Sequence, residues 1–218
     1  MKIAIDIMSG DLPSYSTLNG AVNYLNTYTS DELYLVGNEV FFKKNNSILK
    51  KIKNKNYKLI YAEDKILDTD SVTRLFKKRP ESPLIKTIQL LKDNKVDAIV
   101  SSGNTGALLS SSLMLLGKIE KIKRPALAAF IPTDKGGFVL CDVGANSDNK
   151  PIHLLQFSLM ASAYIKYLEK IDNPKIALLN IGIEPNKGNS MVIDSYKLLD
   201  KYMKNFIGNL ESRYILDN

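Results

Sequence analysis

Polar, glycine-bearing segments follow several predicted strands, and one of them has the residue types of an anion-binding turn. In SSGNTGALL, Ser101–Leu109, the residues Gly103 and Gly106 let the backbone come close to a ligand. Asn104 or Thr105 could cap the next helix, which would leave amides of its first turn pointing outward. Such amides bind phosphate and other anions. An ordinary capped strand-to-helix turn is the alternative interpretation.

Two further segments have a similar character. DVGAN is followed by Lys150, which could neutralise phosphate charge, while Asp142 and Asn146 could orient a substrate. Asp and Asn also stabilise turns that precede a helix beginning with proline, and the spacing leaves both interpretations open.

NIGIEPNKGN places Lys187 and Gly188 before a helix, as a phosphate-holding loop would. It lacks the spacing of a P-loop or a dinucleotide fingerprint, so a purely structural turn stays open.

The first strand ends in DIMSGD, which holds two carboxylates around Gly10. Asp6 and Asp11 could bind a cation or accept protons, or they could form a turn and a helix cap. Basic residues between Arg74 and Arg79 could steer an anion or form a solvated face.

The sequence contains one cysteine and one histidine. A lone Cys141 excludes an intrachain disulfide, and a lone His153 excludes a multi-histidine metal site and disfavours a histidine-based triad. We expect Cys141 to be buried and inert, and His153 to serve as an early-helix or core residue. We predict no metal site.

The chain has 218 residues and a net charge of +7. This charge favours anionic partners, although lysines spread along the whole chain also fit a composition bias.

Met1–Met8 is too short for a signal peptide, and Ala98–Gly117 fits a strand, turn and helix better than a membrane span. We expect a cytoplasmic protein.

Strand-like runs alternate with helical patterns, which predicts an α/β fold with a mostly parallel sheet flanked by helices. The expected strands are 2–8, 33–37, 57–62, 98–101 and 175–181, with one more before the carboxyl end. The expected helices are 16–28, 39–52, 83–92, 105–116, 152–168 and 191–202, the fifth of them buried or at an interface. A β-hairpin is expected around 126–143, and part of 64–82 as a mobile surface segment.

Taken in order, six segments between Lys2 and Ile215 resemble the phosphate acyltransferase family. They are DIMSGD, SSGNTGALL, RPALAAFIPT, DVGANSDNKPIHLLQF, LLNIGIEPNKGN and NFIGNLESRYI. The resemblance implies a Rossmann-like fold akin to phosphotransacetylases and isopropylmalate dehydrogenases, usually dimeric, with its active cleft between two lobes. It implies no metal or organic cofactor.

The sequence departs from the family pattern at several positions. Ser9 stands where a glycine is usual, Leu12–Ser14 replaces a frequent His-Ala-Pro, Glu81 and Ser82 replace a serine pair, and Tyr214 replaces an aspartate. Family members continue for roughly another hundred residues, on the order of a small domain. We therefore expect residues 1–218 to form one catalytic unit that is truncated at its carboxyl end relative to the family.

The resemblance implies attack of a phosphate oxygen on the thioester of acyl-acyl carrier protein, with positioned donors in place of a protein nucleophile. The residues expected to be catalytic are Asn104, Thr105, Asp142, Asn146 and Lys187. Those expected to bind phosphate or substrate are Ser102, Gly103, Gly106, Lys150, Gly188, Asn189, Asp6, Gly10 and Asp11. Expected partners are inorganic phosphate, the acidic acyl carrier protein, a second copy of the chain, and the membrane glycerol-3-phosphate acyltransferase, with peripheral association at the inner membrane face.

Exposed lysines between Lys43 and Lys55 could dock the carrier protein.

One alternative function is that of a phosphotransacetylase-like enzyme that acts on acyl-coenzyme A. Others are a non-catalytic fragment and a basic binding module, but nucleic acid is not expected because the aromatics do not alternate with basic residues on a strand platform.

Overall fold

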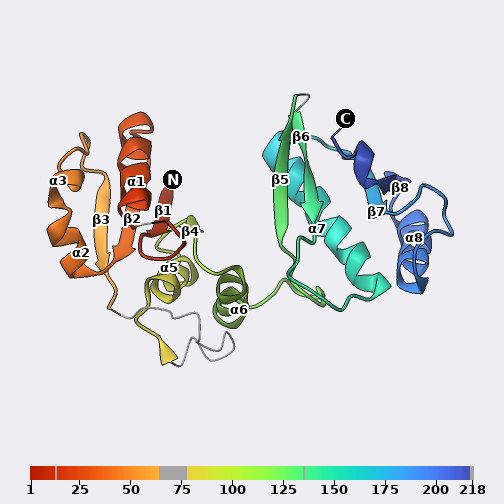
Figure 1. The fold of residues 1–218 in the computed structure, drawn as a ribbon, viewed down its shortest axis with the longest axis horizontal. Coiled ribbons are helices and arrows are strands. Elements are labelled where there is room, and N and C mark those ends of the chain that lie inside the picture. The colour runs from red at the N-terminus through yellow and green to blue at the C-terminus, as the bar shows by residue number, and fades with distance from the viewer. Residues whose placement is uncertain (13, 64–77, 135, 217–218) are drawn as a thin grey trace. The chain divides into compact units, whose positions relative to one another are not determined.

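The computed structural model describes residues 1–12, 14–63, 78–134 and 136–216 (Figure 1). These residues form two compact units, Met1–Gly117 and Lys118–Asn218. Most of the predicted mobile segment 64–82 and part of the Arg74–Arg79 cluster lie outside the described residues. Pro13, one of the departures from the family pattern, lies outside them too.

The first unit is built on a four-stranded parallel sheet with strand order β3-β2-β1-β4. The strands are β1 (Lys2–Asp6), β2 (Glu32–Gly37), β3 (Tyr57–Tyr61) and β4 (Ala98–Ser101). The chain first builds outward from β1 to β3 and then returns to the other side of β1 as β4. The direction of winding therefore reverses between β1 and β4, and ligands of open α/β sheets collect at the carboxyl ends of two such strands.

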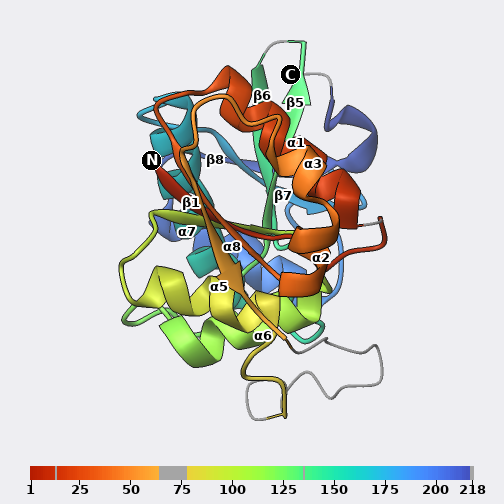
Figure 2. The ribbon, with the colours of Figure 1, turned by 90° about the vertical axis from the view of Figure 1, so that its left-hand side faces the viewer.

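Helices cover both faces of this sheet, as Figure 2 shows. One face carries α1 (Ser14–Thr27), α2 (Glu39–Lys44) and α3 (Asn46–Leu49), and the other carries α5 (Pro83–Lys92) and α6 (Thr105–Leu116). The connections from β1 through β2 to β3 and the connection from β3 back to β4 run in opposite directions across the sheet, and crossovers of one hand then place their helices on opposite faces.

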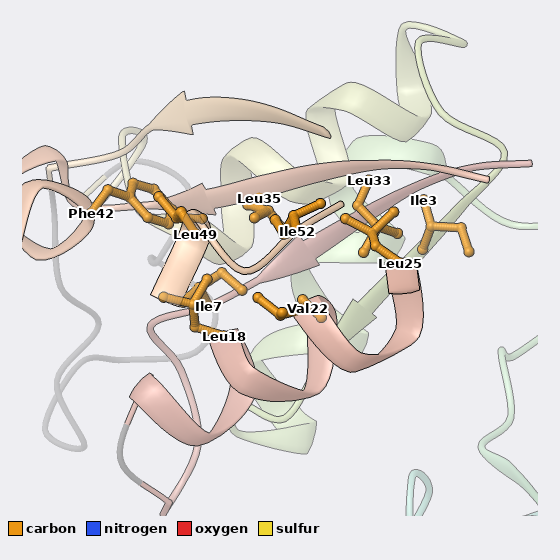
Figure 3. Packing of buried hydrophobic residues seen from close by; sticks show 11 residues of the cluster. Ile3, Ile7, Leu18, Val22, Leu25, Leu33, Leu35, Phe42, Leu49 and Ile52 are labelled. Atoms are coloured by element: carbon orange, nitrogen blue, oxygen red, sulfur yellow. The ribbon is translucent and has the colours of Figure 1, made fainter. Parts of the chain in front are cut away.

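Alternation along the strands divides the core of this unit between the two faces of the sheet. Leu33 and Leu35 of β2 point toward α1, where they pack with the fully buried Leu25 (Figure 3). Tyr34 and Val36 point the other way, into the cluster that includes residues of α5. Burying one leucine side chain contributes about 1.5–3 kcal/mol, so these contacts hold α1 firmly against β2.

The predicted helix 39–52 is wrong in one respect, because the structure breaks it at Asn45. The Nδ2 group of Asn45 donates to the carbonyl oxygen of Phe41 at 2.9 Å, and its backbone leaves helical geometry at φ −104° and ψ 22°. An asparagine side chain that bonds nearby backbone competes with the helix in this way. The segment therefore forms α2 and α3 rather than one helix.

The second unit combines a hairpin with a small α/β layer. Its elements are β5 (Ala128–Thr133), β6 (Gly136–Cys141), α7 (Pro151–Glu169), β7 (Ile176–Asn180), α8 (Ser190–Tyr202), β8 (Phe206–Glu211) and the 3₁₀ turn Ser212–Tyr214. Strands β5 and β6 pair antiparallel, which confirms the predicted hairpin, and β7 pairs parallel with β8. Leu155, Leu178 and Leu199 bring α7, β7 and α8 into one apolar cluster.

Helix α7 was predicted to be buried or at an interface, and within the described unit it is only partly buried. Leu155 and Phe157 are buried, whereas Leu159 is 49 % exposed and Tyr167 is 80 % exposed.

Among the described residues, none of the helices has the length and apolar character needed to cross a membrane.

Candidate active site

The loops that follow β1 and β4 are joined by a hydrogen bond at the carboxyl edge of the first sheet. The hydroxyl of Ser102 donates to the carbonyl oxygen of Ser9 at 2.9 Å. Gly10 has a φ of +108°, and a Cβ atom added there would lie 2.5 Å from Ser102 Oγ. A Cβ atom on Gly103 would lie 2.9 Å from the Cβ of Ser9. Glycine at both positions is therefore required for the two loops to approach so closely.

Asp6 lies beneath these loops as a fully buried side chain. Its Oδ1 accepts hydrogen bonds from the amides of Met8 at 3.1 Å and Ser9 at 3.2 Å. Its Oδ2 accepts the hydroxyl of Ser101 at 2.9 Å, and the oxygen of that hydroxyl accepts the Gly103 amide at 3.2 Å. Ser101 was not among the residues predicted for this site. Asp11 is exposed in the same loop.

Helix α6 begins at this edge and is capped by Asn104, one of the two predicted cap residues. Asn104 Oδ1 accepts the amide of Ala107 at 3.0 Å. Thr105 and Gly106 follow it and are exposed. Amides at the start of a helix lack an intrahelical acceptor, and the helix dipole adds a partial positive charge there. The arrangement can therefore bind an anion beside the two joined loops.

In the second unit, Asp142 organises the turn after β6. Its Oδ1 accepts the amide of Leu127 at 2.8 Å and that of Ala145 at 3.3 Å. Its Oδ2 accepts both the amide and the Nδ2 of Asn146, at 2.9 and 3.0 Å. Asn146 Nδ2 also donates to the carbonyl oxygen of Pro125 at 2.9 Å. Asp142 therefore fixes the position of Asn146, as the turn-stabilising interpretation expects.

Lys150 and His153 form a reciprocal cap at the start of α7. The Lys150 amide donates to His153 Nδ1 at 3.2 Å, and the His153 amide donates to the Lys150 carbonyl at 2.8 Å. Burial lowers the pKa of the imidazole, and the positive charges of Arg124 and Lys150 lower it further. His153 is only 6 % exposed, so it is the early-helix core residue that was predicted.

The loop between β7 and α8 is held by the side chain of Asn180. Its Nδ2 donates to the carbonyl oxygen of Lys187 at 3.1 Å, and Gly188 adopts a φ of +93° beside it. Asn189 caps α8 by accepting the amide of Val192 at 3.0 Å. Lys187 Nζ lies 4.0 Å from Glu184 Oε2, with both side chains about half exposed. Such a solvated pair is weak, so the Lys187 charge stays available to a ligand.

Cys141 is partly buried at the end of β6. Burial raises the pKa of its thiol to about 11, and the neighbouring Asp142 charge adds to the rise. The thiol is thus protonated at neutral pH and is a poor nucleophile. In the part of the chain that the structure describes, no group of three or more His, Cys, Asp or Glu side chains is placed to hold a metal ion.

Two solved structures share the fold of this chain. A branched-chain phosphotransacylase from Enterococcus faecalis V583 superposes with a TM-score of 0.67 at 15% identity, over 98% of this chain and 69% of that one. The EutD phosphotransacetylase from Staphylococcus aureus gives a TM-score of 0.65 at 16% identity, over 97% and 68% of the two chains. The predicted α/β fold of the phosphotransacetylase type is therefore confirmed.

Curated relatives named phosphate acyltransferase are similar over nearly all of this chain. Identity is 42% over 220 residues with the protein from Listeria welshimeri, covering 99% of this chain and 63% of the relative. It is 37% over 218 residues with the protein from Halalkalibacterium halodurans, covering 100% and 64%. The chain thus spans less than two thirds of the length of these relatives.

A family model described as "Fatty acid synthesis protein" matches residues 1–218. This match covers the joined loops of the first unit and the capped turns of the second. The chain therefore belongs to the fatty acid synthesis protein family.

Proposed function

We propose that this chain is a phosphate acyltransferase that moves a fatty acyl group from acyl carrier protein to inorganic phosphate, giving acyl phosphate for phospholipid synthesis. The observation that carries the proposal is the arrangement in the first unit, where the hydrogen-bonded loops after β1 and β4 meet the capped start of α6. The names of the curated relatives support the same reaction.

In this proposal, a phosphate oxygen attacks the thioester carbonyl carbon, a C–O bond forms, and the C–S bond breaks as the carrier-protein thiol leaves. The enzyme must position the phosphate and stabilise the negative charge that develops on the carbonyl oxygen. Asn104 is suited to this, because its Oδ1 serves the cap and its Nδ2 remains a donor. The Gly103 amide already bonds Ser101, so the amides of Asn104 and Thr105 are the better candidate phosphate donors.

Phosphate is itself the nucleophile, so no protein nucleophile is needed. This agrees with the state of the single thiol and the single imidazole. The Cys141 thiol has a pKa of about 11, and His153 Nδ1 is occupied by the Lys150 amide. Neither group is poised to attack a thioester or to take a proton from phosphate.

We propose supporting roles for the other predicted residues. Lys150 and Lys187 supply positive charge, while Asp142 orients Asn146. Ser102, Gly10 and Asp11 shape the phosphate loops together with Gly103 and Gly106, and Gly188 and Asn189 shape the loop that carries Lys187. These roles are supported by the capping and loop contacts of the two units.

We also propose that residues 1–218 act as one catalytic unit, that the enzyme is a homodimer in the cytoplasm, and that it associates with the inner membrane face beside a glycerol-3-phosphate acyltransferase. Exposed lysines around α2 and α3 would dock the acidic carrier protein. They are Lys43, Lys44, Lys50, Lys51, Lys53 and Lys55.

The test is an assay of the folded chain with phosphate and either palmitoyl-acyl carrier protein or palmitoyl-coenzyme A, with hydroxylamine trapping acyl phosphate as the hydroxamate. The proposal expects hydroxamate that requires phosphate and forms faster from the carrier-protein thioester. Faster reaction with the coenzyme A thioester would favour the phosphotransacetylase-like alternative. The two solved structures that share the fold are a phosphotransacetylase and a phosphotransacylase, which makes this alternative worth testing. No product from either thioester would contradict the proposal.

A further inference from the structure

We propose that the buried Asp6 and the partly buried Ser101 are a pair of positioning residues that set the geometry of the phosphate loops without touching phosphate. This inference rests on the function proposed above. It gives Asp6 a role different from the direct ligand contact that its sequence motif suggested. It also adds Ser101, which begins the SSGNTGALL motif but was not among the predicted site residues.

The pair stands where the winding of the sheet reverses. Asp6 ends β1 and Ser101 ends β4, and the two residues are register partners in the parallel ladder. Each is followed at once by one of the two joined loops. A contact between these two side chains therefore fixes the relative position of the points from which both loops depart.

The hydrogen bonds form a directed chain from the core to the loop. A carboxylate only accepts hydrogen bonds, so the Ser101 hydroxyl must point its proton at Asp6 Oδ2, 2.9 Å away. A lone pair of the same oxygen then accepts the Gly103 amide at 3.2 Å. The Gly103 peptide is thereby held immediately before Asn104, the residue that caps α6.

Direct contact between Asp6 and phosphate is disfavoured by two features. The side chain is 0 % exposed, and both of its oxygens already accept hydrogen bonds. A carboxylate would also repel a phosphate anion. Asp6 therefore acts through Ser101 and through the amides of Met8 and Ser9.

The experiment compares three variants of the ¹⁵N-labelled chain by NMR titration with inorganic phosphate. Ser101→Ala removes the bridging hydroxyl, and Ser101→Thr retains it. Ser111→Ala is the matched control, because Ser111 is 1 % exposed and its Oγ has no hydrogen-bond partner among the described residues. Thermal unfolding of each variant reports its stability.

We expect Ser101→Ala to weaken phosphate binding about tenfold, the effect of roughly one hydrogen bond, and to speed hydrogen exchange of the Gly103 amide. Ser101→Thr and Ser111→Ala should bind phosphate within about twofold of the parent chain. A Ser101→Ala variant that binds phosphate as the parent does would overturn the inference. So would equal weakening in Ser101→Thr, since the hydroxyl would then not be the cause.

Failure of the proposed function and failure of the Asp6–Ser101 positioning role give different results in this experiment. If the parent chain shows no phosphate-dependent shifts in the loops after β1 and β4, the proposed function fails, and the positioning role fails with it. If the parent binds phosphate but Gly103 exchange and affinity are unchanged in Ser101→Ala, only the positioning pair is wrong.

Discussion

Ser102 donates its hydroxyl proton to the carbonyl oxygen of Ser9, a residue 93 positions earlier in the chain, at 2.9 Å. This bond closes the two loops over the carboxyl ends of β1 and β4. Gly10 follows Ser9 and lies against the same serine side chain. The loop after β1 can therefore keep its shape only while Gly10 has no Cβ atom.

Replacing Gly10 with alanine should separate the two loops. The new Cβ atom would lie 2.5 Å from Ser102 Oγ, in a backbone conformation of φ +108° that L-residues rarely adopt. Strain of about 1–3 kcal/mol is expected from the backbone alone, and phosphate binding should weaken. Urea unfolding and a phosphate titration measure the two effects.

Gly20→Ala is the matched control for that variant. Gly20 lies inside α1, where an added Cβ atom meets nothing within 4 Å. It should stabilise the chain by about 0.5–1 kcal/mol and leave phosphate binding unchanged. Equal free energies of unfolding for the Gly10 and Gly20 variants would contradict the prediction, because a Cβ atom at Gly10 would then cause no strain.

Asn104→Asp should separate capping from phosphate binding. Aspartate caps helices as well as asparagine does, so the Ala107 contact and the free energy of unfolding should be kept to within about 1 kcal/mol. The new carboxylate replaces a donor with a repelling charge, so turnover should fall by about 10²–10³. Acyl phosphate formation and urea unfolding measure the two quantities.

Asn38→Asp makes the same change at the start of α2, where the Asn38 side chain accepts the amides of Val40 and Phe41. It should leave turnover as it is. Turnover of Asn104→Asp within threefold of the parent chain would remove Asn104 from the catalytic site.

His153 should make folding stability depend on pH near neutrality. Burial holds the pKa of the folded imidazole below its unfolded value, which is about 6.5. Above that pH both states are neutral. As the pH falls below it, the unfolded chain binds a proton before the folded chain does, so the free energy of unfolding decreases until the folded pKa is reached. NMR titration of the single imidazole and urea unfolding between pH 5 and 8 would detect this.

His153→Gln is the control for the pH effect. Glutamine at this position of a helix can still accept the amide of Lys150 but does not titrate. Stability at pH 7.5 should be largely kept, and the decrease caused by His153 should disappear. An imidazole pKa at or above 6.5 in the folded chain would contradict the assigned environment.

Charge reversal on the lysine-rich face should affect the carrier protein and spare phosphate. Lys50→Glu with Lys51→Glu should raise the KM for acyl-acyl carrier protein several-fold, most strongly at low salt, without changing the KM for phosphate. Lys201→Glu with Lys204→Glu makes the same change in net charge in the second unit. If both pairs of substitutions raise the KM equally, the face around α2 and α3 is not a specific docking site.

Local signals in the sequence were enough to place the helices that border the site. Pro83 in the first turn indicated the start of α5, and Asn104 or Thr105 as a cap indicated the start of α6, because both signals act within one turn of the helix. The predicted bounds of both helices agree with the structure. By contrast, the break at Asn45 depended on one side-chain contact with Phe41 that a helical pattern does not reveal.

The contact between Asp6 and Ser101 could not be predicted, because it depends on the register of β1 with β4. Those residues are 95 positions apart, and neither shares a motif with the other. The order of the glycine-bearing segments indicated the family, but only the paired strands reveal which of the polar residues face each other. The pairing of Glu184 with Lys187 was likewise hidden, since it depends on the turn that Asn180 holds.

Phosphate labelled with ¹⁸O shows directly whether phosphate is the acceptor of the acyl group. The folded chain is incubated with palmitoyl-acyl carrier protein and the labelled phosphate, and the products are analysed by mass spectrometry. Acyl transfer to phosphate should give palmitoyl phosphate that retains every labelled oxygen, together with free carrier-protein thiol. Release of palmitic acid without acyl phosphate, or an unchanged thioester, would contradict it.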